Sequence, residues 1–123
     1  MGRNTDRVRA LAKICGAEAL AREQLDTRRF DAVVHATPLG MYPQVDECFF
    51  NGSIPADVVF DMVYNPVETV LIKRAREQGK TVVLGLDMFI EQAVRQFEIW
   101  TGESAPRPAM EKAAAEALEH GYK

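Results

Sequence analysis

Three short apolar runs, separated by stretches with helical periodicity, constrain the fold of this chain most strongly. They span residues 31–37, 56–61 and 81–84, and glycine or proline lies close to the end of each. The first run is almost continuously apolar, which predicts a strand buried on both faces. Strands that alternate with helices predict an α/β fold, with a parallel sheet flanked by helices.

Apolar residues at helical spacing predict four helices, over residues 6–14, 67–78, 87–101 and 108–120. Thr5 is the expected N-cap of the first helix, and Gly16 follows its end. The third helix carries its apolar side chains on one face, namely Phe89, Ala93, Phe97 and Trp100.

Length and composition indicate one globular domain over residues 1–123. Of the 123 residues, 47% are apolar and 27% are charged, which is typical of a soluble folded chain. The formal net charge of −3 provides no general attraction for phosphate backbones, so nucleic-acid binding is not expected. No apolar segment has the length of a membrane span or resembles a signal peptide, and we expect a cytoplasmic protein.

The two cysteines, Cys15 and Cys48, are far apart and lack a neighbouring second ligand. This spacing favours reduced, buried or half-buried thiols with a structural role over a disulfide or a metal site. We therefore expect no metal site in this chain.

Three loops are predicted to meet at one edge of the sheet. Thr37, Met62 with Tyr64, and Gly85 each lie just after the carboxyl end of a predicted strand. Ligands of open α/β sheets bind in the crevice beyond these ends. The sequence therefore predicts a ligand site where the loops converge.

The residues of these loops suit a nicotinamide ring and a polyhydroxylated acid. Gly85 lets the backbone approach a flat ring closely, and Met62 and Met88 offer polarizable apolar surface. Tyr64 and Gln92 have groups that hydrogen-bond hydroxyls or a carboxylate.

Three motifs together cover most of the chain and resemble the successive signatures of shikimate dehydrogenases. They are Thr37-Pro38-Leu39-Gly40-Met41, Asp61-x-x-Tyr64-Asn65-Pro66-x-x-Thr69, and the segment from Gly85-Leu86-x-Met88 through Gln92-Ala93 to Trp100-Thr101-Gly102. The amino-acid sequence of the third motif is most similar to that of the dehydrogenase half of bifunctional dehydroquinate dehydratase–shikimate dehydrogenase proteins.

The resemblance implies roles for individual residues. Tyr64 and Gln92 would contact a substrate of the shikimate type, and Arg3 and Arg7 would clasp the adenosine 2′-phosphate of NADP. The nicotinamide end of NADP would be lined by Ala36, Thr37, Met62, Gly85 and Met88. His35 stands where relatives usually carry asparagine, and we expect it to be a buried histidine with satisfied hydrogen bonds.

The same resemblance implies a partial Rossmann-like, doubly wound domain, the C-terminal portion of an NADP-binding domain. The sequence contains no G-x-G-x-x-G, and we expect the first two strands, the Gly-rich loop and the N-terminal catalytic domain to be absent. The family's catalytic lysine and aspartate lie in that N-terminal domain. The strand over residues 31–37 would then be an open edge, and such an edge favours a homo-oligomer.

Three functions agree with these observations. The first is the C-terminal part of an NADP-dependent shikimate dehydrogenase of aromatic amino acid biosynthesis, an oxidoreductase of the chorismate pathway that would be catalytically incomplete in isolation. The second is a non-catalytic oligomerisation or interaction module that retains the fold. The third is a fragment of a quinate/shikimate-type dehydrogenase. In each case, loss of the pyrophosphate loop predicts weak or absent NADP binding by the isolated chain.

Overall fold

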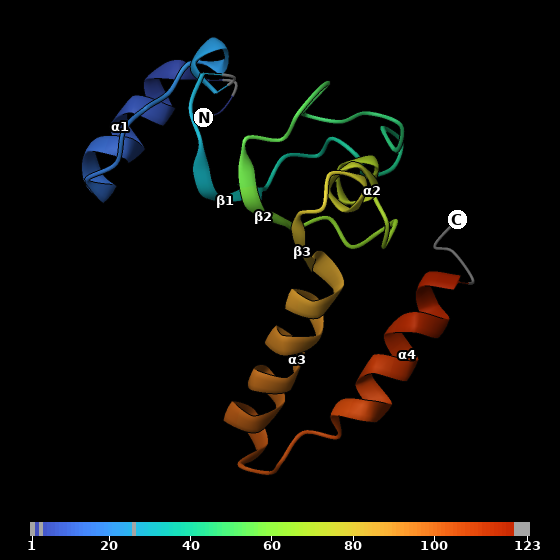
Figure 1. Cartoon of the computed structure of the whole chain (residues 1–123). Helices are drawn as coiled ribbons and strands as arrows, with labels where there is room; N and C mark the ends of the chain where they lie inside the picture. The colour runs from blue at the N-terminus through green and yellow to red at the C-terminus, as the bar shows by residue number, and fades with distance from the viewer. Residues whose placement is uncertain (1, 3, 26, 120–123) are drawn as a thin grey trace. The chain divides into compact units, whose positions relative to one another are not determined.

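The computed structural model describes residues 2, 4–25 and 27–119 of the chain. It divides into two compact units, residues 1–30 and residues 31–123. Figure 1 shows the order of the helices and strands along the chain. Within the described residues, no helix is both long and apolar enough to cross a bilayer.

The first unit contains helix α1 (Thr5–Cys15) and a short 3₁₀ helix, η1 (Arg22–Gln24). The N-cap of α1 is Asn4 rather than Thr5, because the Asn4 side chain accepts a hydrogen bond from the Arg7 backbone N–H at 3.0 Å. Gly16 ends the helix with φ of 63°, as expected. Cys15 is exposed, contrary to the expectation of a buried or half-buried thiol, whereas Cys48 is half-buried; both cysteines are free.

The second unit is built on a three-stranded sheet of β1 (Phe30–His35), β2 (Ala56–Asp61) and β3 (Thr81–Leu84) in the order β1-β2-β3. Strands β2 and β3 pair in parallel from Val58 opposite Thr81 to Asp61 opposite Leu84. The parallel α/β architecture is confirmed, and so are the predicted bounds of β2 and β3. Strand β1 lies at one edge of this sheet (Figure 1).

The prediction that β1 is buried on both faces was wrong. Val34 is 61% exposed and Ala32 is also exposed, whereas His35 at the end of the strand is buried. An apolar sequence shows that a strand is suited to burial on both faces. It does not show which helix or strand packs against each face. In the described residues, the face that carries Ala32 and Val34 is left open.

Helix α2 (Val70–Glu77) follows β2, and helix α3 (Gly85–Thr101) follows β3. Helix α4 (Arg107–Glu119) comes after α3. Helix α3 leaves directly from the end of β3, and α4 runs back alongside it (Figure 1). Helix α2 begins three residues later than predicted, because Thr69 has extended backbone and caps the helix by accepting the Ile72 N–H at 3.2 Å.

The buried stripe of α3 differs from the predicted one. Its buried side chains include Ile90 and Val94, whereas Trp100 is 79% exposed. Residues four apart share a helix face, so Ile90 and Val94 define a stripe turned by about 100° from one that begins at Phe89. The core of the described residues is formed by Phe50, Ile54, Ala56, Val59, Val63, Leu71, Ile72, Ala75, Ile90 and Val94.

Candidate functional site

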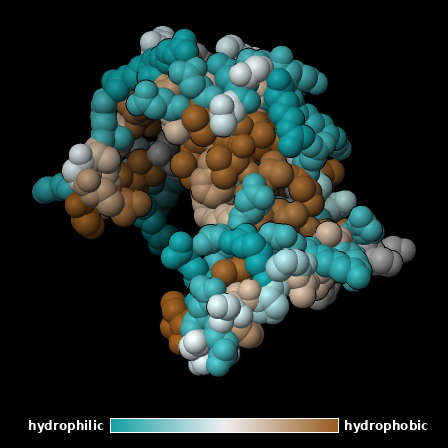
Figure 2. All heavy atoms as spheres, turned by 60° about the horizontal axis from the view of Figure 1, so that its bottom comes forward, coloured by the Kyte–Doolittle hydropathy of each residue, from teal (hydrophilic) through white to brown (hydrophobic). Residues whose placement is uncertain are grey.

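A hollow of about 770 Å³ lies beyond the carboxyl ends of β1 and β2, where the sequence predicts a ligand site. Figure 2 shows apolar atoms gathered in the middle of one face of the molecule, bordered by polar ones. The residues that line the hollow are Ala36, Thr37, Pro38, Met41, Tyr42, Met62, Val63, Tyr64, Asn65, Phe89, Ala114, Ala117 and Leu118.

None of these lining residues is charged, and their polar side chains are hydroxyls and one amide. Such a surface accepts a flat, largely apolar ring and directs a few hydrogen bonds to its substituents. The lining groups that can exchange a proton are the hydroxyls of Thr37, Tyr42 and Tyr64. The hollow is therefore suited to binding and orienting a ligand.

Four of the predicted site residues meet in this hollow, namely Ala36, Thr37, Met62 and Tyr64. The ring of Tyr64 stacks on Phe89 of α3, with ring centroids 4.7 Å apart and an angle of 20° between the planes. This stacking fixes the phenol ring against a helix, which gives its hydroxyl a defined position at the rim.

Two other predicted site residues, Met88 and Gln92, do not line this hollow. Met88 lines a second hollow, of about 420 Å³, together with Asp87 and Arg107. Gln92 is exposed on α3 and lines neither hollow. Arg7 is exposed in α1, within the other unit, and Arg3 lies outside the described residues.

Gly85 belongs to the rim through its backbone. A Cβ atom at this position would lie 2.5 Å from the Val63 carbonyl oxygen and 2.6 Å from that of Met62. Only glycine allows the start of α3 to come so close to the loop after β2. The close approach seen at Gly85 is to the protein's own backbone, and the approach to a flat ring stays a prediction.

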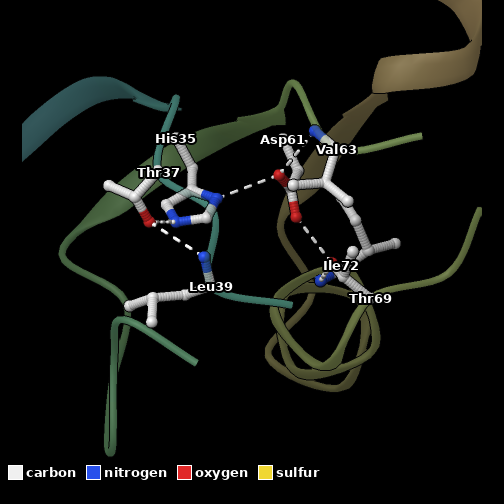
Figure 3. Close-up of polar contacts among 7 residues, drawn as sticks. All are labelled: His35, Thr37, Leu39, Asp61, Val63, Thr69 and Ile72. Carbon is white, nitrogen blue, oxygen red and sulfur yellow. Dashed lines mark hydrogen bonds and ion pairs between the residues drawn. The ribbon is translucent and has the colours of Figure 1, made fainter. Parts of the chain in front are cut away.

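The loops at the rim are joined by the carboxylate of Asp61, which is fully buried at the end of β2. Its Oδ1 accepts the Val63 backbone N–H at 3.1 Å and lies 3.0 Å from Nδ1 of His35, while Oδ2 accepts the Thr69 hydroxyl at 2.6 Å (Figure 3). Thr69 in turn caps α2. One side chain thus connects the end of β1, the loop after β2 and the start of α2.

His35 is buried, with 5% of its surface exposed, and both ring nitrogens have partners. Nε2 lies 2.6 Å from the hydroxyl of Thr37, which also accepts the Leu39 N–H at 3.4 Å (Figure 3). The expectation of a buried histidine with satisfied hydrogen bonds is confirmed. Its partners, however, place it directly behind a residue of the hollow.

Helix α4 forms one wall of the hollow, and ion pairs join it to α3. Arg107 donates to Glu91, and Arg95 donates to the same carboxylate at 2.9 Å. The hydrogen bonds from Arg107 and, secondarily, from Arg95 hold the pKa of Glu91 below its usual range, and the hydrogen bond to Glu91 raises the pKa of Arg107. Among the described residues, no cluster of three potential metal ligands occurs.

Sequence reasoning missed several lining residues. Met41 and Tyr42 directly follow the Thr37–Gly40 segment, so their position in the predicted ligand-binding loop could have identified them. Phe89 was assigned to a packing face of α3, and its contact with Tyr64 requires the three-dimensional arrangement. The small residues Ala114 and Ala117 carry no signal of their own, because alanine is common in any exposed helix.

Comparison with known proteins adds to this geometry. Residues 85–115 match the family profile of the shikimate 5′-dehydrogenase C-terminal domain. The shikimate dehydrogenase (NADP(+)) of Oleidesulfovibrio alaskensis is 38% identical over 125 residues, covering 97% of this chain and 44% of the relative. The chain belongs to the shikimate dehydrogenase family.

Solved structures of the family share this fold. The shikimate 5-dehydrogenase of Thermus thermophilus, in complex with NADP(H) and shikimate, superposes with a TM-score of 0.75 at 28% identity, covering 93% of this chain and 43% of that one. The quinate dehydrogenase of Corynebacterium glutamicum, in complex with NAD, gives 0.76 at 32% identity, covering 93% and 44%. The chain thus spans less than half the length of these members of the shikimate dehydrogenase family.

Replacement of Asp61 by asparagine is expected to destabilise the second unit by about 1–3 kcal/mol, because an amide presents an N–H where a buried donor needs an acceptor. Urea denaturation of D61N against the unmodified chain measures this loss. The matched control is D46N, since Asp46 is an exposed carboxylate. Equal stability of D61N and D46N would contradict a joining role for Asp61.

Replacement of Gly85 by alanine is expected to cost about 1–3 kcal/mol, because the new methyl group must displace the backbone of residues 62–63. Amide NMR shifts should move most strongly in residues 61–65. The control is G52A, since a Cβ at Gly52 meets nothing within 4 Å. If G85A left these shifts and the unfolding midpoint unchanged, the close approach described above would be wrong.

Proposed function

We propose that this chain provides the C-terminal part of an NADP-dependent shikimate dehydrogenase, which transfers hydride between NADP(H) and the 3-dehydroshikimate/shikimate pair in aromatic amino acid biosynthesis. One observation carries the proposal. Ala36, Thr37, Met62 and Tyr64, each assigned a ligand role by resemblance, come from two separate loops and line a single hollow. The family membership and the uncharged lining support the same assignment.

In this proposal the hollow holds the nicotinamide ring. Met62 provides an apolar surface for the ring, and Ala36 and Thr37 border its carboxamide side. Tyr64 directs its hydroxyl to a substrate hydroxyl or carboxylate. NADP supplies the hydride acceptor and donor, and the residues of this chain bind and orient it.

The remaining assigned residues have weaker support from the geometry. We assign Gly85 and Met88 to the nicotinamide side and Gln92 to the substrate because of their motif positions. Arg7 and Arg3 are assigned to the 2′-phosphate on the same basis. Met88 and Gln92 would join the site only through contacts beyond the first hollow.

Hydride transfer in this proposal also requires the N-terminal domain that carries the family's catalytic lysine and aspartate. The likeness to members more than twice as long supports this requirement. Similarity to the Corynebacterium quinate dehydrogenase leaves quinate as the alternative substrate. The two substrates differ in ring substituents, and the lining residues offer only hydroxyls and an amide for telling them apart.

The test combines calorimetry with an assay. The chain is titrated with NADP, alone and after mixing with the separately expressed N-terminal domain of the Oleidesulfovibrio relative, and shikimate and quinate oxidation are then measured. We expect weak or absent binding by the chain alone, and turnover in the mixture. A mixture with no binding and no turnover would contradict the proposal and favour a non-catalytic module.

Within the active mixture, Tyr64→Phe is expected to lower kcat/KM for shikimate about tenfold, the effect of one lost hydrogen bond to the substrate. Stacking on Phe89 survives the change, so the unfolding midpoint should stay within error. A large loss of stability with unchanged turnover would instead give Tyr64 a structural role.

We also propose that the isolated chain forms a homo-oligomer through β1. The strand lies at the edge of the sheet, and Val34 is largely exposed. An uncovered apolar edge strand pairs readily with another chain. Sedimentation velocity should show an oligomer that Val34→Lys shifts toward monomer, whereas a monomer at all working concentrations would overturn this proposal.

A further inference from the structure

His35 stands between the most buried carboxylate of the rim and a hydroxyl of the hollow. Its Nδ1 lies 3.0 Å from Asp61 Oδ1, and its Nε2 lies 2.6 Å from Thr37 Oγ1. Figure 3 shows the imidazole bridging these two side chains, which come from the ends of β2 and β1. The donor and the acceptor of each of these hydrogen bonds can be assigned in turn, beginning at the carboxylate.

The assignment starts at Asp61, because an ionised carboxylate only accepts hydrogen bonds. Its two oxygens already accept the Val63 N–H and the Thr69 hydroxyl. Thr69 has one hydroxyl proton, which it gives to Asp61, since its oxygen accepts the Ile72 N–H. The contact with His35 therefore needs a proton on Nδ1 of the imidazole.

A neutral imidazole with its proton on Nδ1 has a bare Nε2, which accepts a hydrogen bond. In this neutral tautomer, the proton of the 2.6 Å contact is that of the Thr37 hydroxyl. Thr37 then donates its hydroxyl hydrogen bond to Nε2 of His35. Its oxygen retains two lone pairs, and the Leu39 N–H, at 3.4 Å, engages only one of them.

We propose that His35 is held as the neutral tautomer with its proton on Nδ1, and that it is a positioning residue that makes the Thr37 hydroxyl a hydrogen-bond acceptor toward the hollow. A ligand group with an N–H or O–H donor is thereby selected at this point, and a bare carbonyl or carboxylate is disfavoured. Given the function proposed above, the group is the primary carboxamide of the nicotinamide. The burial of His35 and the direct 2.6 Å contact carry this inference, because they leave the Thr37 proton no freedom to rotate toward a ligand.

The tautomer can be measured without any ligand. The chain contains two histidines, His35 and His120, so a long-range ¹H–¹⁵N correlation spectrum of the labelled full chain, with H120Q for assignment, resolves the His35 ring. We expect a protonated Nδ1 and a bare Nε2 at pH 7. A proton on Nε2, in either the other tautomer or the imidazolium, would overturn the positioning role.

The ligand preference is tested with NADP and its 3-acetylpyridine analogue, which keeps the carbonyl and lacks the N–H donors. NMR titration of the full chain mixed with the relative's N-terminal domain should show about five- to tenfold weaker binding of the analogue. In T37V the difference should fall below twofold, and T37S should restore it. Equal binding of both nucleotides by the unmodified chain would contradict the selection.

A second variant separates positioning from folding. In H35F the Thr37 hydroxyl loses its acceptor, so the preference for the carboxamide over the acetyl analogue should fall. In T37S, which retains His35, the preference should remain. The urea midpoint is measured in parallel, and D46N again reports the effect of an exposed change. Absence of binding by either nucleotide would refute the proposed cofactor, while the tautomer spectrum would still decide the role of His35.

Discussion

The second unit depends on the buried carboxylate of Asp61. A buried carboxyl group is tolerated only when hydrogen bonds replace its water, and here the Val63 N–H, the Thr69 hydroxyl and Nδ1 of His35 are its partners. These partners lie at the end of β1, in the loop after β2 and before α2. The free energy of burying the carboxylate therefore couples the positions of three segments that are separated in sequence.

This coupling explains why the hollow can be built from loops. Loop residues are usually free to vary in position, but the loop after β2 is fixed by Asp61 on one side and by Gly85 on the other. Met62 and Tyr64 belong to this loop, and Tyr64 rests on Phe89. The sheet and α3 thus determine the shape of the hollow.

The sequence predicted those parts that depend on local pattern. The bounds of β2 and β3 followed from short apolar runs, and the convergence of Thr37, Met62 and Tyr64 followed from the topology of parallel strands. The exposure of β1 and the position of the buried stripe on α3 were predicted wrongly, because both depend on which elements pack against them. The contact of His35 with Thr37 was also beyond reach, since a lone histidine gives no sign of its partners.

We propose that the hollow beyond β1 and β2 holds the nicotinamide ring of NADP. Intermolecular NOEs test it most directly, measured between NADP and methyl-labelled chain mixed with an N-terminal domain of the family. We expect NOEs from the nicotinamide protons to the methyl groups of Met62 and Thr37. NOEs confined to methyl groups outside the hollow, such as those of the exposed Ile99 on α3, would contradict it.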